Sequence, residues 1–270
     1  MRIGVRAHDY GKNTPEGLVT KIKEVGFEAV QLAIPKAISG IDTFDQITPE
    51  LLKKIHEVFK KSDIELSVFG CYIEPALLDK EARMGQVSRF LKALEYSKTI
   101  DALLVGTETT HFTTDESERP KAFEALVDSV QRMVEKAEEI DAIVGIEPVS
   151  VHTLNTPELT YKLLQRVKSN HLKIIFDPVN LLTFENSKNQ EGLWKECFEA
   201  FGAEIEAIHV KNVIIENNAF KHVLLEDGLV DYQFLFNWFN THKSHVSVLR
   251  ENADPQTAYR DVAFLKQKIV

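Results

Sequence analysis

The stretch AIVGIEP, residues 142–148, decides the fold of this chain, because it is an apolar run that ends at a carboxylate, Glu147. Continuous apolar runs of this kind are typical of parallel strands that are covered on both faces. Three later runs have the same form: LKIIFD (172–177) with Asp177, EAIHV (206–210) with His209, and HVSVLRE (245–251) with Glu251. Together the four runs predict successive parallel strands that bring three carboxylates and one imidazole to the same edge of a sheet.

Outward from these runs, apolar segments alternate with segments of helical periodicity. The helix over 118–139 has the clearest signal, because its apolar residues follow the i, i+3, i+4, i+7 spacing of an amphipathic helix. The predicted strands are 2–8, 27–34, 64–72, 102–108, 142–148, 172–177, 205–211 and 245–251. The predicted helices are 15–25, 49–61, 80–99, 118–139, 157–169, 190–201, 231–242 and 255–268.

Proline placement supports this division of the chain. Four prolines directly follow Thr or Asp, which predicts an N-cap residue with proline at the first helical position. These are Pro15, Pro49, Pro157 and Pro255. Pro120 also falls near a predicted helix start.

Eight strand–helix units in 270 residues predict a single α/β domain over 1–270, a closed (β/α)₈ barrel of the TIM type. A doubly wound open sheet is the competing fold, and it usually has a glycine-rich phosphate loop after its first strand. Here that position reads AHDYGKNTPEG (7–17), which lacks the GxGxxG pattern.

The composition limits the class of protein. A net charge of −9 argues against a nucleic-acid partner, which needs a basic surface. Cys71 and Cys197 have no CxxC spacing, so neither a disulfide framework nor a zinc–thiolate site is expected. The start MRIGVRAHDY is strand-like, and no apolar run is long enough to span a bilayer. We therefore expect a cytoplasmic protein with no membrane partner, and a homo-oligomer is compatible with these features.

Three carboxylates and an imidazole at one rim predict a metal centre. Each of these residues also has an ordinary interpretation: a lysine partner for Glu147, an Asp-Pro turn at Asp177, a core hydrogen bond for His209 and an ion pair of Glu251 with Arg250. Together they are harder to explain in that way, since buried carboxylates at adjacent strand ends need a compensating cation. Oxygen ligands with one nitrogen suit a divalent ion; Mn²⁺ is favoured, and Mg²⁺, Co²⁺ and Zn²⁺ are alternatives.

A second set of polar residues is predicted near the same rim. Lys211 lies two residues beyond His209, and could hold a substrate oxygen or phosphate or could neutralise the acidic cluster. The other candidates for substrate contact are Asn180, Glu108, His111, His8 and Tyr72, each of which also has a purely structural interpretation.

The chain resembles the xylose isomerase-like barrel superfamily, which includes sugar phosphate isomerases/epimerases and AP endonuclease-type proteins. The resemblance covers essentially the whole chain in element order. It is carried by GTET (106–109), GIEP (145–148), FDPVN (176–180), IHVKN (208–212) and LREN (249–252).

The resemblance implies that Glu147, Asp177, His209 and Glu251 ligate one divalent ion, and that the two glutamates also form the acid–base pair. The ion would act as a Lewis acid on a ketose carbonyl while one glutamate removes a proton from carbon and the other returns one. The implied function is a metal-dependent isomerase or epimerase of a sugar or sugar phosphate.

Some residues depart from the family pattern and leave alternatives open. Asn180 stands where related sugar epimerases usually have His, and the HVK string resembles inosose dehydratases, although Asn212 stands where those often have Asp. A dehydratase or lyase acting on a cyclitol or keto sugar is therefore the second hypothesis. A non-catalytic sugar-binding barrel and a metal-dependent hydrolase are further alternatives. The histidines of the three-metal DNA-repair branch are missing, which argues against abasic-site cleavage.

Overall fold

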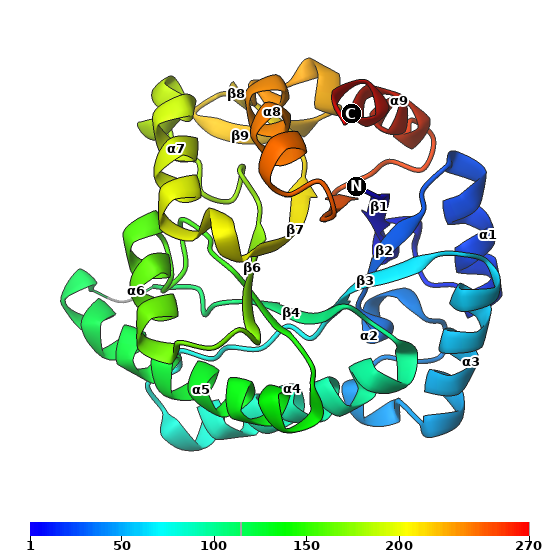
Figure 1. Ribbon diagram of the computed structural model, residues 1–270, viewed down its shortest axis with the longest axis horizontal. Coiled ribbons are helices and arrows are strands. Elements are labelled where there is room, and N and C mark those ends of the chain that lie inside the picture. Colours follow the sequence, from blue (N-terminus) through cyan, green and yellow to red (C-terminus); the bar gives the residue numbers. More distant parts are fainter. Residues whose placement is uncertain (114, 270) are drawn as a thin grey trace.

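Eight parallel strands close into a barrel in the computed structural model, which describes residues 1–113 and 115–269 (Figure 1). The predicted TIM-type α/β barrel is therefore confirmed. The order around the barrel is β1-β10-β7-β6-β5-β4-β3-β2. The strands are β1 (Ile3–Arg6), β2 (Ala29–Leu32), β3 (Glu65–Gly70), β4 (Leu104–Glu108), β5 (Val144–Glu147), β6 (Leu172–Phe176), β7 (Ile205–Val210) and β10 (Ser247–Arg250).

The inside of the barrel is filled by small and branched side chains. These are Ala29, Val68, Leu104, Ile175, Ala207 and Leu249. Glycine is needed where neighbouring strands contribute larger groups: a Cβ on Gly106 would lie 2.6 Å from Ile175 Cδ1. Because the interior is packed, chemistry is restricted to the ends of the barrel.

A ring of helices covers the outside of the barrel (Figure 1). The helices are α1 (Pro15–Val25), α2 (Ile34–Ala37), α3 (Pro49–Lys61), α4 (Lys80–Ile100), α5 (Arg119–Ile140), α6 (Pro157–Val167), α7 (Gln190–Phe201), α8 (Tyr232–His242) and α9 (Ala258–Lys268). Among the described residues, no helix combines the length and the apolar character that crossing a membrane requires.

Three of the four predicted proline caps are confirmed. Thr14, Thr48 and Thr156 accept hydrogen bonds from the backbone of α1, α3 and α6, each with proline at the first helical position. The prediction at Pro255 was wrong, because α9 begins only at Ala258. Asp254 instead accepts a 2.9 Å hydrogen bond from Gln256 N, which forms a local turn.

An antiparallel hairpin between β7 and α8 was not predicted. It consists of β8 (Asn212–Glu216) and β9 (Ala219–Val223), joined by Asn217 and Asn218. Both asparagines have positive φ, at 51° and 57°, as a two-residue type I′ turn requires. The hairpin begins one residue after Lys211, at the same end of β7 as the predicted site.

Candidate metal centre

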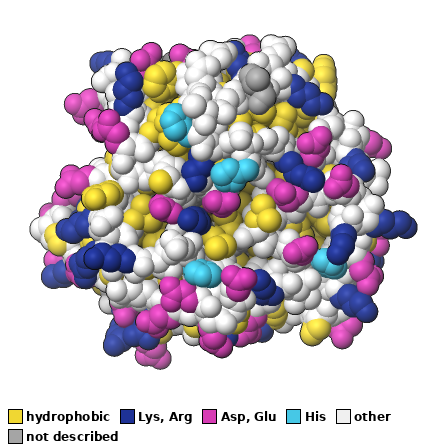
Figure 2. All heavy atoms as spheres, in the orientation of Figure 1, with side chains coloured by type: hydrophobic (Ala, Val, Ile, Leu, Met, Phe, Trp, Pro, Cys, Tyr) yellow, Lys and Arg dark blue, Asp and Glu magenta, His cyan; other side chains and the backbone are white. Residues whose placement is uncertain are grey.

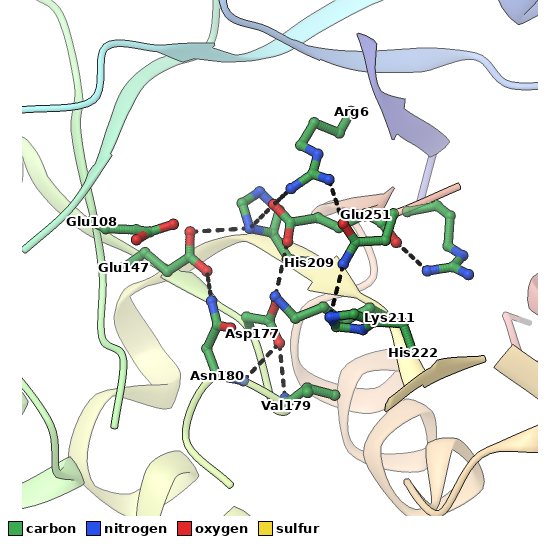
Figure 3. Close-up of polar contacts among 12 residues, drawn as sticks. Arg6, Glu108, Glu147, Asp177, Val179, Asn180, His209, Lys211, His222 and Glu251 are labelled. Atoms are coloured by element: carbon green, nitrogen blue, oxygen red, sulfur yellow. Dashed lines mark hydrogen bonds and ion pairs between the residues drawn. The ribbon is translucent and has the colours of Figure 1, made fainter. Parts of the chain in front are cut away.

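The residues predicted from the strand ends meet at one rim of the barrel (Figure 3). Glu147 is the last residue of β5, and Asp177 follows the end of β6. His209 lies within β7, and Glu251 follows β10. All four are buried, at 5 % exposure or less. Parallel strands bring their carboxyl ends to the same side, so residues distant in sequence become neighbours.

Three of the four residues form a compact group of potential ligands. One ligand atom from each of Glu147, Asp177 and His209 lies within 4.8 Å of the other two. His209 Nδ1 is 3.1 Å from Glu147 Oε2 and 3.5 Å from Glu251 Oε1. Glu251 lies outside the compact group. Its other oxygen, Oε2, is 3.0 Å from Lys211 Nζ.

Lys211 bridges two of the carboxylates. Its ammonium nitrogen is 2.9 Å from Asp177 Oδ2 and 3.0 Å from Glu251 Oε2. The hydroxyl of Tyr232 donates a 2.5 Å hydrogen bond to the carbonyl oxygen of Lys211, which fixes the backbone at this point. These ion pairs place a positive charge within the acidic cluster, and a contact of Lys211 with substrate stays a prediction.

The donor atoms fit a divalent cation. Within residues 1–113 and 115–269, neither ring nitrogen of His209 forms a hydrogen bond, and Asp177 Oδ2 has the ion pair with Lys211 but accepts no hydrogen bond. Asp177 Oδ1 is engaged, because it accepts from Val179 N (2.8 Å) and Asn180 N (3.1 Å). The loop thus holds one oxygen and leaves the other to the ion pair with Lys211. A buried Glu/Asp/His triad of this kind could bind a metal ion whose identity it does not fix.

Burial and mutual repulsion shift the pKa values at the site. Burial, reinforced by Glu251 and Glu147 and opposed by Lys211, raises the pKa of Asp177 to about 6. Burial and the same two glutamates raise the pKa of Glu108 to about 7. Burial opposes charge on His209, but Glu147 and Glu251 outweigh it and raise its pKa to about 9. Burial likewise opposes ionisation of Glu251, but Lys211, His209 and Arg6 hold its pKa well below the usual range. Positive charge, such as that of a bound cation, would therefore stabilise the ionised carboxylates of the site.

Asn180 directly contacts a predicted ligand. Its side-chain amide donates a 2.6 Å hydrogen bond to Glu147 Oε1, the oxygen that does not face His209. Asn180 thus helps to fix the orientation of this carboxylate.

The remaining candidates lie around the mouth at different depths. Glu108 pairs in register with Glu147, and its Oε2 is 3.7 Å from His152 Nε2. His111 is exposed, with its ring centre 5.7 Å from that of His152. Near the middle of this face, histidine, acidic and basic side chains lie side by side (Figure 2).

Tyr72 and His8 lie on the side of β1 to β3. The hydroxyl of Tyr72 accepts a 2.7 Å hydrogen bond from Gln31 Nε2, and Lys36 Nζ lies 3.9 Å from the centre of its ring. The prediction that His8 ends the first strand was wrong. β1 stops at Arg6, and His8 lies in a 3-10 turn, Ala7–Tyr10, where its Nδ1 is buried without a hydrogen-bond partner among the described residues.

Sequence reasoning missed Arg6 and misjudged Arg250. Arg6, the last residue of β1, places NH1 3.5 Å from Glu251 Oε1. The rule that found the carboxylates, a polar residue at the downstream end of an apolar run, could also have found Arg6. The alternative ion pair of Arg250 with Glu251 is not formed. Arg250 Nε instead donates a 2.7 Å hydrogen bond to buried Asp261 of α9.

Comparison with solved structures shows the fold. A D-tagatose 3-epimerase-like protein has a TM-score of 0.81 at 17% identity, over 99% of this chain and 97% of that one. The probable 3-DHS dehydratase AsbF from Bacillus anthracis has a TM-score of 0.75 at 15% identity, over 98% and 99%. The IOLI protein with a bound zinc atom has a TM-score of 0.75 at 13% identity, over 100% and 98%.

Sequence comparison gives the family. No curated protein sequence matches the chain. A family model for the xylose isomerase-like TIM barrel matches residues 19–268, which is most of the chain. The chain belongs to the xylose isomerase-like TIM barrel family.

Proposed function

We propose that the protein is a divalent-metal-dependent isomerase or epimerase of a sugar or sugar phosphate. The observation that supports this most is that two carboxylates lie close to the same imidazole nitrogen. Glu147 from β5 and Glu251 from β10 approach His209 Nδ1 at 3.1 Å and 3.5 Å. Two carboxylates beside one metal-compatible group suit proton removal and proton return at a single bound molecule.

Glu147, Asp177 and His209 would hold the ion, and Glu251 is the fourth proposed ligand. When bound, the ion would stabilise negative charge on the substrate oxygens. Mn²⁺ is our first choice, with Mg²⁺, Co²⁺ and Zn²⁺ as alternatives. These four side chains are buried, and burial strengthens the electrostatic interactions among them.

The two glutamates would carry the protons. One of them takes a proton from the carbon next to the carbonyl, and the other delivers one from the other side. Return to the same carbon on its opposite face gives the epimer, whereas return to the neighbouring carbon gives the aldose–ketose isomer. Hydroxyls or a phosphate of the substrate would meet the polar residues of the mouth, Lys211, Asn180, Glu108, His111, His8 and Tyr72.

Exchange of carbon-bound hydrogen with solvent tests this proposal directly. Aldoses, ketoses and cyclitols, with and without phosphate, are incubated with the protein and Mn²⁺ in D₂O and followed by NMR and mass spectrometry. We expect deuterium at a single sugar carbon, with no loss of water, and no exchange after chelation of the metal. A complete lack of exchange across these classes would reject the proposal.

A dehydratase acting on a cyclitol or keto sugar is the second candidate. The observation that favours it is the hydrogen bond from Asn180 to Glu147. Asn180 stands where the sugar epimerases that the chain resembles usually have His. In the same D₂O experiment, a product lighter by one water would support the dehydratase and contradict the isomerase.

A further inference from the structure

We propose that Arg6 is a positioning residue that fixes the direction of the Glu251 carboxylate. This inference rests on the proposed function, in which Glu251 is one of the two proton carriers. It assigns to β1 a part in a site whose predicted metal ligands come from β5, β6, β7 and β10.

The guanidinium of Arg6 is engaged on several sides (Figure 3). Nε and NH2 donate hydrogen bonds of 2.9 Å and 2.8 Å to Asp9 Oδ1. NH2 also donates a 2.6 Å hydrogen bond to Asn252 Oδ1. NH1 remains, and it faces Glu251 Oε1 at 3.5 Å. A planar guanidinium held along one edge presents its remaining nitrogen in a fixed direction.

Asp9 extends this contact into a clamp around Glu251. Its second oxygen, Oδ2, accepts a 2.9 Å hydrogen bond from Ala253 N. The segment just after β10 is therefore tied to the β1 side through Asn252 and Ala253, the two residues that follow Glu251. The clamp lies across the seam where β1 pairs with β10.

Contacts from two strands then fix the carboxylate itself. Oε1 faces Arg6 NH1 and His209 Nδ1, each at 3.5 Å, and Oε2 faces Lys211 Nζ at 3.0 Å. Rotation of the carboxylate would weaken these contacts together. Arg6 has most of its donors committed and a side chain that is only 19% exposed, so it has little capacity left to bind a substrate.

Steady-state kinetics of the Mn²⁺-loaded full chain test this role. Arg6→Gln removes both the charge and the planar guanidinium with its several donors, whereas Arg6→Lys keeps only the charge. Since small displacements of a reacting group are costly, we expect kcat of Arg6→Gln to fall about 10- to 100-fold. We expect KM to change by less than about threefold, and Arg6→Lys to recover part of the lost kcat.

The matched control is Arg2→Gln, just before the opposite end of β1. Arg2 forms ion pairs of 3.5 Å and 3.6 Å with Asp63 and Glu65, remote from Glu251. We expect its kcat and KM to equal those of the wild type. A loss as large as that of Arg6→Gln would show that any damage to β1 impairs the barrel, which would overturn the inference.

A crystal structure of Arg6→Gln gives a readout that does not depend on activity. We expect the Glu251 carboxylate to leave its present direction while Glu147, Asp177 and His209 keep theirs. An unmoved Glu251, or a raised KM with an unchanged kcat, would overturn the positioning role. The proposed function fails separately, if the wild type itself exchanges no carbon-bound hydrogen.

Discussion

Gly228 packs directly against the side chain of Asn212, beside the site. Asn212 is fully buried, donates a 2.8 Å hydrogen bond from Nδ2 to Leu225 O, and accepts from Val213 N and Val230 N at 2.9 Å and 3.0 Å. Gly228 lies against this side chain, so closely that a Cβ there would be 2.6 Å from Asn212 Cβ. The side chain of Asn212 therefore stabilises the backbone of the hairpin and of the loop after it. The preceding residue, Lys211, is the one whose side chain lies in the site.

Gly228→Ala is expected to destabilise the fold. The added methyl overlaps an amide that already satisfies three backbone groups, so either the hydrogen bonds or the loop must shift. The expected loss in the free energy of unfolding is about 1–3 kcal/mol, measured by urea denaturation. Gly85→Ala is the control, because that glycine lies in α4 with no atom within 4 Å of an added Cβ. A stable Gly228→Ala would contradict the close approach.

Glu147→Gln and Glu251→Gln are expected to abolish turnover without unfolding the barrel. Each change removes a proton carrier and keeps the side-chain volume, so kcat should fall at least about 100-fold. Hydrogen exchange in D₂O and the thermal midpoint are the measurements. Glu206→Gln, on the same strand as His209, is the control and should keep full activity. If either variant retained activity within about tenfold of wild type, the acid–base assignment would be wrong.

Lys211→Met is expected to make stability depend strongly on metal. Without the ammonium, Asp177 and Glu251 lose a buried cation 2.9 Å and 3.0 Å away. Breaking such a buried pair costs about 3–5 kcal/mol, so the metal-free variant should melt well below the metal-free wild type. Mn²⁺ should then raise the melting temperature more in the variant than in the wild type. Scanning calorimetry with and without chelator measures this, and equal metal-free melting temperatures would contradict it.

His8 is expected to contribute to loss of stability in mild acid. Burial, with Arg6 and Lys36 nearby, lowers the pKa of His8 from 6.5 to about 4. The unfolded chain therefore binds this proton more readily than the folded one, and the free energy of unfolding falls as the pH falls from 6.5 to about 4. His8→Gln should make this fall shallower, as measured by urea denaturation at several pH values. His245→Gln, at an exposed position, is the control, and an equal slope in His8→Gln and wild type would refute the expectation.

The barrel could be predicted because its strands are apolar on both faces. That pattern located all eight of them, and the rule that parallel strands end on one side brought Glu147, Asp177, His209 and Glu251 together. Sequence could not give the distances, which put Glu251 beside Arg6 and Lys211 rather than in the compact ligand group. Those distances depend on which rotamer each buried side chain adopts among its neighbours.

The hairpin did have a signal in the sequence. Two strand-like runs flank Asn217-Asn218, a pair suited to positive φ and hence to a two-residue turn. The signal is weak because the second run, AFKHV, is largely exposed, so its side chains mark no core. Predicting strands by apolar content finds those of the barrel and passes over strands that lie at its surface.

The bond between Arg6 and Asn252 joins residues that are 246 positions apart, across the seam of β1 and β10. While a ribosome is still making the chain, β1 emerges early and has no neighbour on this side until β10 follows. The pocket is therefore completed among the last events of synthesis, and a nascent chain released before β10 contains only part of it.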